Sequence, residues 1–174
     1  GVAGAYVDTH LVLDGAAVGV PAAAEAEAVV VPVRLADGTT RVVVVSTGAE
    51  GVSLTPVGST GQGSMATVQF TGVQVPAEDL LDGGEVDVAA WTLQRARLAL
   101  CGVQLGTCAE ALTTTAAYVS EREQFGRPIS TNQAVAVRAA DAHLDTEAIR
   151  LTTQRAAWLL DSGRDQEAES AVLV

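Results

Sequence analysis

Residues 118–129 read Tyr-Val-Ser-Glu-Arg-Glu-Gln-Phe-Gly-Arg-Pro-Ile and separate two long segments with helical spacing. The glycine and proline of this stretch are the residues that commonly end a helix, so we predict a tight connection between two helices. Arg122, Gln124 and Arg127 would then lie near a helix end, with the aromatic Phe125 among them. The stretch therefore predicts a compact cluster of hydrogen-bond donors at one end of a helical hairpin.

The first helical segment is predicted to begin at Ala89, and its apolar residues are distributed around a mostly buried rod. They are Trp91, Leu98, Val103, Leu105, Leu112 and Val119. Gly102 and Gly106 are four residues apart and so share a face, which predicts close approach of a second helix. Cys101 and Cys108 are seven apart, about 10 Å along a helix, too far for a disulfide. We expect both cysteines to be buried small apolar residues in a reducing compartment.

The second helix is predicted to start at a capping box, Ser130-Thr131-Asn132-Gln133, in which Gln133 would reach back to the cap. Ser162 and Gly163 are predicted to end it, and Arg164 to open a third helix. Apolar residues at three- and four-residue spacing predict one apolar stripe. Its members are Val137, Ala140, Leu144, Ala148, Leu151 and Leu159.

The first 80 residues are predicted to form β structure, with a turn or loop between successive runs of β-branched residues. Asp37-Gly38 is a strong hairpin signal between two such runs. The predicted strands are residues 6–13, 29–35, 41–47, 52–57 and 65–70, with a loop at 22–28. The glycine-rich residues 58–64 lead into a strand and lack a following Lys-Ser/Thr, so they are interpreted as a flexible loop, not a phosphate site.

Strands followed by helices indicate an α+β fold or two adjoining domains. The predicted architecture is part of an antiparallel β-barrel or sandwich domain, residues 1–84, followed by part of an up-down helical bundle, residues 85–174. A two-helix hairpin cannot bury its apolar stripe alone, so further helices must come from more sequence or from a partner subunit. The start at Gly1 and the apolar run at Val174 predict that both ends are cuts in a longer chain.

The balance of 10 Lys+Arg against 21 Asp+Glu gives a formal net charge of -11. This acidity argues against broad binding to nucleic acid or anionic membranes, so any anion must be met by local arginines. His10 and His143 are far apart in sequence and give no metal-ligand spacing with the cysteines. With no apolar run long enough to span a bilayer and no signal peptide, the expected location is cytoplasmic.

Residues 122–129, Arg-Glu-Gln-Phe-Gly-Arg-Pro-Ile, followed by Gln133 and Ala140-Asp141, resemble the signature of the acyl-CoA dehydrogenase family between the first two helices of its C-terminal bundle. Upstream, Phe70-x-x-Val73-x-Val75-Pro76 and Leu80-Leu81 resemble the end of that family's middle β domain. The resemblance covers nearly the whole chain in the same order and spacing.

The resemblance implies that Arg122, Gln124 and Phe125 reach the FAD of an adjacent subunit, with the arginine at the pyrophosphate, and that Asn132 and Gln133 also contact FAD. A guanidinium suits phosphate because its hydrogen bonds are bidentate and charge-assisted. Without the resemblance, Arg122 is more simply a solvated helix-end cation, Gln133 a cap and Phe125 a core residue under the turn.

The resemblance also implies that Gln94 and Arg97 lie near an acyl-CoA substrate, although Arg97 could equally be a surface arginine paired with a carboxylate. It implies α,β-dehydrogenation by FAD and a glutamate base, reoxidation by an electron-accepting flavoprotein, and assembly into homo- or hetero-oligomers through the bundle. In most members that glutamate lies beyond the position of Val174. In a minority it matches Ala96, which cannot accept a proton, so no catalytic residue is assigned within the chain.

Two alternatives therefore accompany the dehydrogenase interpretation. The chain could belong to a non-catalytic partner subunit that contributes FAD contacts to a heteromeric dehydrogenase, or it could be a structural module without a cofactor. A fragment of the enzyme alone is expected to be inactive.

Overall fold

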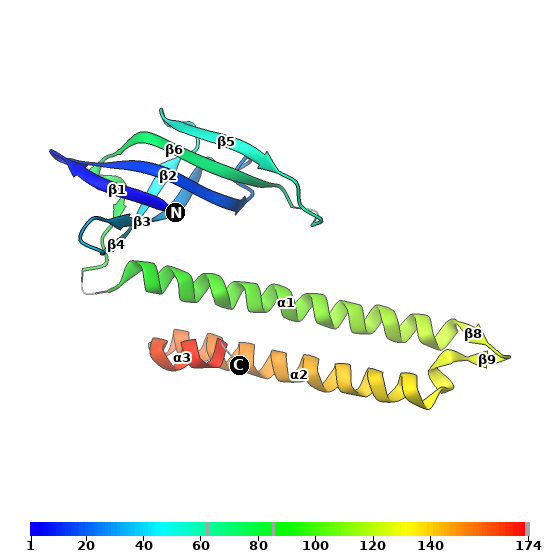
Figure 1. The fold of residues 1–174 in the computed structure, drawn as a ribbon. Helices are drawn as coiled ribbons and strands as arrows, with labels where there is room; N and C mark the ends of the chain where they lie inside the picture. The colour runs from blue at the N-terminus through cyan, green and yellow to red at the C-terminus, as the bar shows by residue number, and fades with distance from the viewer. Residues whose placement is uncertain (62, 85, 173–174) are drawn as a thin grey trace. The chain divides into compact units, whose positions relative to one another are not determined.

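The computed structural model describes residues 1–61, 63–84 and 86–172, and the chain divides into two compact units, Gly1–Trp91 and Thr92–Val174. Strands make up nearly all the regular structure of the first unit and helices that of the second, which confirms the α+β class (Figure 1). Each unit is described separately below.

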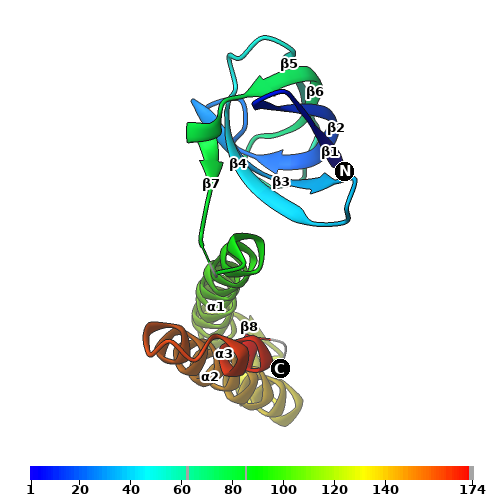
Figure 2. The same cartoon turned by 90° about the vertical axis from the view of Figure 1, so that its left-hand side faces the viewer.

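The first unit is built on one seven-stranded sheet with the order β5-β6-β2-β1-β3-β4-β7. The strands are β1 (Val2–Val7), β2 (His10–Pro21), β3 (Ala28–Leu35), β4 (Thr40–Ser46), β5 (Val52–Val57), β6 (Met65–Val75) and β7 (Leu80–Leu81). In the described residues, β1 and β3 pair in parallel and the other neighbours pair antiparallel. The sheet curls around its own interior (Figure 2).

Alternation of buried and exposed residues places the core on the inner face of this curled sheet. In β3, Val29, Val31 and Val33 are buried while the residues between them are exposed. Phe70 and Leu13 are among the largest fully buried side chains. Period-two alternation of this kind is what a sheet with one solvated face requires.

The predicted β3–β4 hairpin is confirmed, with Val29 opposite Val45 and Arg34 opposite Thr40. Gly38 has φ 84°, the left-handed conformation that glycine adopts at little cost. The carboxylate of Asp37 accepts hydrogen bonds from the backbone N–H and the hydroxyl of Thr39, at 2.8 and 2.7 Å. These two bonds lower the pKa of Asp37, since they stabilise its charged form.

The single strand predicted for residues 6–13 is wrong. The chain reverses at Asp8–Thr9, so that Val7 of β1 pairs with His10 of β2. Asp8 adopts φ 54°, a conformation that aspartate tolerates better than most residues. Continuous β propensity on both sides of the turn concealed it.

The second unit contains α2 (Gln133–Asp161), α3 (Asp165–Val172) and most of α1 (Val88–Glu121). α1 and α2 run side by side in opposite directions (Figures 1 and 2). The predicted end of α2 is confirmed, because Ser162 follows its last residue and Gly163 has φ 71°. The guanidinium of Arg164, before α3, hydrogen-bonds Glu167 and lies over Trp158 at 5.4 Å from the ring centroid.

The predicted capping box is wrong in detail. Residues Ile129–Thr131 form a short 3-10 turn, and Asn132 is the N-cap of α2. Its side-chain oxygen accepts a hydrogen bond of 3.0 Å from the backbone N–H of Ala134. Gln133 is the first helical residue, so it stands two positions too early to close a box with Asn132.

The apolar stripe predicted for α2 is mostly exposed in this chain, as expected of a helical pair that cannot bury it alone. Leu159 is buried, but Val137, Leu144 and Leu151 are exposed. α1 has no buried residue along its length, and nothing described lies within 4 Å of a Cβ built on Gly102 or Gly106. The close helix approach predicted for these glycines is therefore absent within the described chain. No helix in the described residues is long and apolar enough to cross a bilayer.

Candidate functional site

The connection between α1 and α2 is a miniature β-hairpin. Strands β8 (Glu123–Gln124) and β9 (Arg127–Pro128) pair antiparallel, with Gln124 opposite Arg127. Phe125 and Gly126 occupy the two turn positions with φ 56° and 76°. Two successive positive φ values are the pattern of a type I′ turn, which matches the twist of a two-stranded ribbon. The glycine predicted to end the helix instead forms the tip of this hairpin.

Hydrogen bonds tie the base of the hairpin to the start of α2. The backbone N–H of Ile129 donates to the carbonyl of Arg122 at 2.9 Å, and the N–H of Asn132 donates to the carbonyl of Ile129 at 3.0 Å. These two bonds hold Arg122 and the N-terminus of α2 at the same end of the helical pair. The structure thus brings Arg122, Gln124, Phe125, Asn132 and Gln133 to one end of the unit, and all five are exposed.

Phe125 is fully exposed, at 101% relative accessibility, so the alternative interpretation of it as a core residue under the turn is wrong within this chain. A bulky residue with positive φ is strained by about 1–2 kcal/mol, and such strain persists where the surroundings enforce it. Here a hairpin holds an aromatic ring out at its tip. This geometry suits contact with another molecule or another chain.

Gln94 and Arg97 lie near the opposite end of α1. The side-chain amide of Gln94 donates to the backbone carbonyl of Asp165 at 3.2 Å, and Arg95 approaches the Asp165 carboxylate at 3.9 Å. Arg97 lies within α1, and Arg122 directly follows the last residue of that helix. The two arginines are 25 residues apart, which corresponds to about 37 Å at 1.5 Å per residue. Within one chain, the two sets of candidate residues therefore cannot meet around one bound molecule.

The hydrogen bond from Gln94 to Asp165 gives Gln94 a structural role in addition to any contact with a ligand. Its amide and the guanidinium of Arg95 join α1 to the first residue of α3, close to the end of α2. These contacts hold together the end of the hairpin that lies away from β8 and β9. They were not predicted from the sequence, because the position of α3 depends on the turn at Gly163.

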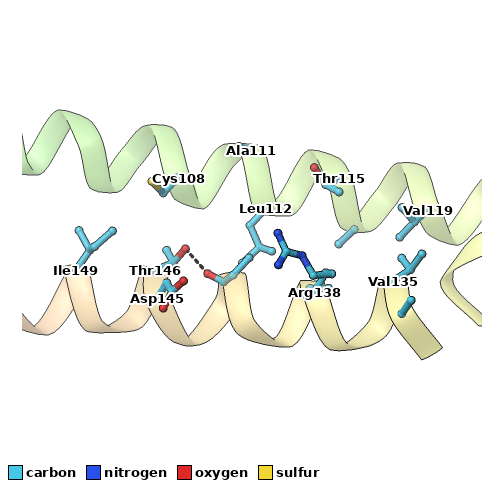
Figure 3. Close-up of a pocket in the computed structure, with 14 residues that line it drawn as sticks. Cys108, Ala111, Leu112, Thr115, Val119, Val135, Arg138, Asp145, Thr146 and Ile149 are labelled. Atoms are coloured by element: carbon cyan, nitrogen blue, oxygen red, sulfur yellow. Dashed lines mark hydrogen bonds between the residues drawn. The ribbon is translucent and has the colours of Figure 1, made fainter. Parts of the chain in front are cut away.

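Between α1 and α2 lies an apolar groove of about 680 Å³ that the sequence did not predict (Figure 3). Leu112 from α1 and Arg138 from α2 both point into it, and the Thr146 hydroxyl is held by the carbonyl of Ala142 at 2.7 Å. Small residues on both helices leave the space open. They are Ala111, Thr115 and Ala116 on α1 and Ala134, Ala139 and Ala142 on α2.

The two cysteines are free and half-buried, so the expectation that they are buried is wrong, while the absence of a disulfide between them is confirmed. The amide of Gln104 donates to the sulfur of Cys108 at 3.4 Å. Across residues 1–61, 63–84 and 86–172, no cluster of three or more His, Cys, Asp or Glu side chains is arranged to hold a metal ion.

Residues 84–173 match the family model described as "Acyl-CoA dehydrogenase, C-terminal domain". The chain is 38% identical over 133 residues, 76% of its length and 35% of the relative's, to the acyl-CoA dehydrogenase FadE27 of Mycobacterium tuberculosis. It also superimposes on a chain of the ChsE4-ChsE5 complex from Mycobacterium tuberculosis with a TM-score of 0.91 and 33% identity, covering 98% of this chain and 46% of that one.

A further similar structure is a variant of the Tcur3481-Tcur3483 steroid ACAD, with a TM-score of 0.87 and 30% identity over 98% of this chain and 45% of that chain. The chain therefore spans less than half the length of these relatives.

Proposed function

The chain belongs to the acyl-CoA dehydrogenase family, and from that premise we propose that the whole protein is a FAD-dependent oxidoreductase that removes two hydrogens from an acyl-CoA thioester. The observation that carries the proposal is the outward-facing end of the helical pair. It presents a guanidinium, three side-chain amides, an aromatic ring and a helix N-terminus together.

This set of groups fits the chemistry of FAD. Arg122 would bind the pyrophosphate, because a guanidinium forms paired charge-assisted hydrogen bonds to phosphate oxygens. The N-terminus of α2 adds a positive dipole end that favours the same anion. Since the oxygen of Asn132 is engaged by Ala134, its NH₂ group remains to donate. Phe125 supplies an apolar surface for a ring, and Gln124 and Gln133 supply further donors.

FAD, when bound, supplies hydride acceptance from the β-carbon of the substrate, and the protein supplies orientation and a base. Gln94 and Arg97 are proposed to face the acyl-CoA at the other end of α1. Because the two ends of α1 are about 37 Å apart, each copy of the chain would contribute residues to two different flavin sites. One copy contributes the hairpin to a neighbour's FAD, so the active unit is an oligomer assembled through the helical bundle.

We also propose that residues 1–84 are the final part of the middle β domain and residues 85–174 the start of the C-terminal helical bundle. An electron-accepting flavoprotein is proposed to reoxidise the cofactor. The similarity to a structure named as an electron transferring flavoprotein, at 26% identity and a TM-score of 0.86, supports a relation between this fold and electron transfer.

The second candidate is a non-catalytic partner chain of a heteromeric dehydrogenase. It is favoured by the printed names of the similar structures, since the ChsE4-ChsE5 complex and the Tcur3481-Tcur3483 steroid ACAD each combine two different components. The second of these names, which describes a steroid ACAD, favours a steroid-derived acyl-CoA as substrate. Alanine at position 96, exposed on α1, supplies no base of its own, so a catalytic carboxylate must come from elsewhere in the chain or from a partner.

The test is flavin retention by the full-length protein and its Arg122→Ala variant. Arg122→Ala is expected to lose FAD during gel filtration, whereas Arg164→Ala retains it, because the Arg164 guanidinium is engaged by Glu167 away from the hairpin. Visible flavin absorbance relative to protein absorbance measures both. Equal flavin content in the two variants would remove the assigned role of Arg122.

Co-expression with candidate partner chains separates the other interpretations. A protein that shows no flavin absorbance in any combination supports a structural module. Acyl-CoA oxidation that appears only with a partner, and survives replacement of every carboxylate candidate in this protein's bundle, supports the non-catalytic chain.

A further inference from the structure

The donor side chains of the β8–β9 hairpin lie on one face of its two-stranded ribbon. Gln124 stands directly opposite Arg127 in the ladder. The backbone N–H of Ile129 donates to the carbonyl of Arg122 at 2.9 Å, which continues the same ladder towards α1. Side chains alternate between the faces of a strand, and directly opposite residues share a face. Arg122, Gln124 and Arg127 therefore project from one face, which we call the donor face.

The opposite face of the ribbon carries no cation among its paired residues. Glu123 and Pro128 form the pair between the two hydrogen-bonded pairs, so their side chains lie on that opposite face. Proline fits there because a non-hydrogen-bonded pair needs no backbone N–H from it. The carboxylate of the ribbon is thus separated from its guanidinium groups by face.

Both arginines of the donor face are exposed. Within the part of the chain that the structure describes, neither the Arg122 nor the Arg127 guanidinium forms a hydrogen bond or an ion pair. Arg150 and Arg164, by contrast, are each bonded to a glutamate three residues away. Diagonal positions on a ribbon are about 7–8 Å apart, within reach of long side chains, so the two guanidinium groups can bind one ligand together.

We propose that Arg127 binds the pyrophosphate of FAD together with Arg122, as a second phosphate-binding residue of the hairpin. The inference rests on the proposed function, in which this hairpin meets the cofactor. Each phosphate of FAD carries a negative charge, and Arg122 supplies a single positive one. The net charge of -11 repels anions at long range, so cations beside the phosphates must provide the attraction. A second guanidinium on the same face provides it through charge-assisted hydrogen bonds.

Gln124, between the two arginines, is less able to bind the second phosphate. Its side-chain amide already donates to the carbonyl of Glu123 at 2.9 Å, and an amide carries no charge. A guanidinium offers five N–H donors in a fixed fork that matches phosphate oxygens. The second phosphate is therefore assigned to Arg127.

The test measures the FAD affinity of flavin-free full-length protein by quenching of flavin fluorescence. Arg127→Gln should raise the Kd at least about tenfold, because charge-assisted hydrogen bonds are lost. Arg127→Lys keeps the charge without the paired geometry and should raise the Kd less. Glu123→Gln is the matched control, because it changes charge by the same amount on the opposite face of the same ribbon. It should change the Kd by less than about twofold, since solvent and salt screen that face.

Two further readouts separate phosphate binding from other roles. ADP carries the pyrophosphate without the flavin ring, so its competition against FAD should weaken in Arg127→Gln by the same factor as FAD binding. The urea unfolding midpoint of flavin-free Arg127→Gln should equal that of the unmodified protein, because the guanidinium has no partner within the described residues.

The proposal is overturned if Arg127→Gln leaves the Kd for FAD unchanged, as a solvated surface arginine would. It is also overturned if Glu123→Gln shifts the Kd as far, if ADP competition is unaltered, or if the unfolding midpoint falls. Arg122→Ala, measured beside these variants, distinguishes the two proposals. Loss of FAD in Arg122→Ala alone removes only the role of Arg127, whereas full retention in both variants removes the hairpin from the flavin site.

Discussion

Replacing Phe125 by asparagine should change stability and cofactor binding in opposite directions. Phe125 has φ 56° at the first turn position of the β8–β9 hairpin and is fully exposed. For a bulky residue the left-handed conformation costs about 1–2 kcal/mol, whereas asparagine adopts it readily. No burial within the chain is lost. Phe125→Asn should therefore stabilise the flavin-free protein by about 1 kcal/mol.

The same substitution removes the aromatic surface proposed to contact FAD. A stacked or edge-to-face aromatic contact contributes about 1 kcal/mol, so FAD should bind about fivefold more weakly. Urea unfolding of flavin-free protein, followed by circular dichroism at fixed protein concentration, measures the first effect. Quenching of flavin fluorescence measures the second. Phe125→Tyr is the control that keeps both the ring and the strain, and it should change neither quantity.

A loss of stability in flavin-free Phe125→Asn would refute the reasoning, since it would show that the ring packs within its own chain. Unchanged FAD affinity would refute the proposed contact while leaving the strain argument intact. The two measurements therefore test the backbone and the ligand separately.

Two further predictions concern local hydrogen bonds. Asn132→Ala should lower the free energy of unfolding by about 1 kcal/mol in a thermal or urea titration, because the N–H of Ala134 loses its cap, whereas Gln133→Ala should not. Hydrogen bonds from Thr39 lower the pKa of Asp37. The charged form of Asp37 should therefore stabilise the β3–β4 turn fully above the ordinary aspartate pKa of 3.8, and this stabilisation should be lost as the pH falls through the lowered pKa of Asp37 in the folded protein. The pH titration of the Thr39 amide resonance should follow this transition, and Asp37→Asn should abolish it; a Thr39 resonance insensitive to acid would contradict the assignment.

Local sequence signals predicted much of the fold. The β3–β4 hairpin followed from Asp37-Gly38, and the end of α2 followed from Ser162-Gly163, because glycine is the residue that adopts positive φ most easily. The failures occur at two turns that the surrounding sequence does not signal. Asp8 reverses the chain inside a continuous β pattern, and Phe125 occupies a position where asparagine or glycine is common.

The sequence predicted which residues cluster at the candidate site, but it did not predict the β-hairpin on which they lie. The spacing from Arg122 to Gln133 placed the donors at a helix end, yet the miniature hairpin depends on a phenylalanine with positive φ, which no propensity predicts. The apolar stripe predicted for α2 is largely exposed in this chain, because a pair of helices cannot bury it alone. The residues that line the groove with α1 are mostly small, and periodicity alone does not identify such a face.

The helical unit has little core of its own, and this links its folding to its assembly. Among its described residues the buried side chains are Thr146, Ala156, Leu159 and Ala168, and α1 buries none. So few buried groups cannot offset the entropy of ordering two long helices, so contacts beyond this hairpin must supply the difference. Covering the groove between α1 and α2 stabilises both helices, and any partner that binds the folded form raises its apparent stability. Loss of FAD from a hairpin variant is therefore evidence about Arg122 or Phe125 only when the oligomeric state of the variant is unchanged.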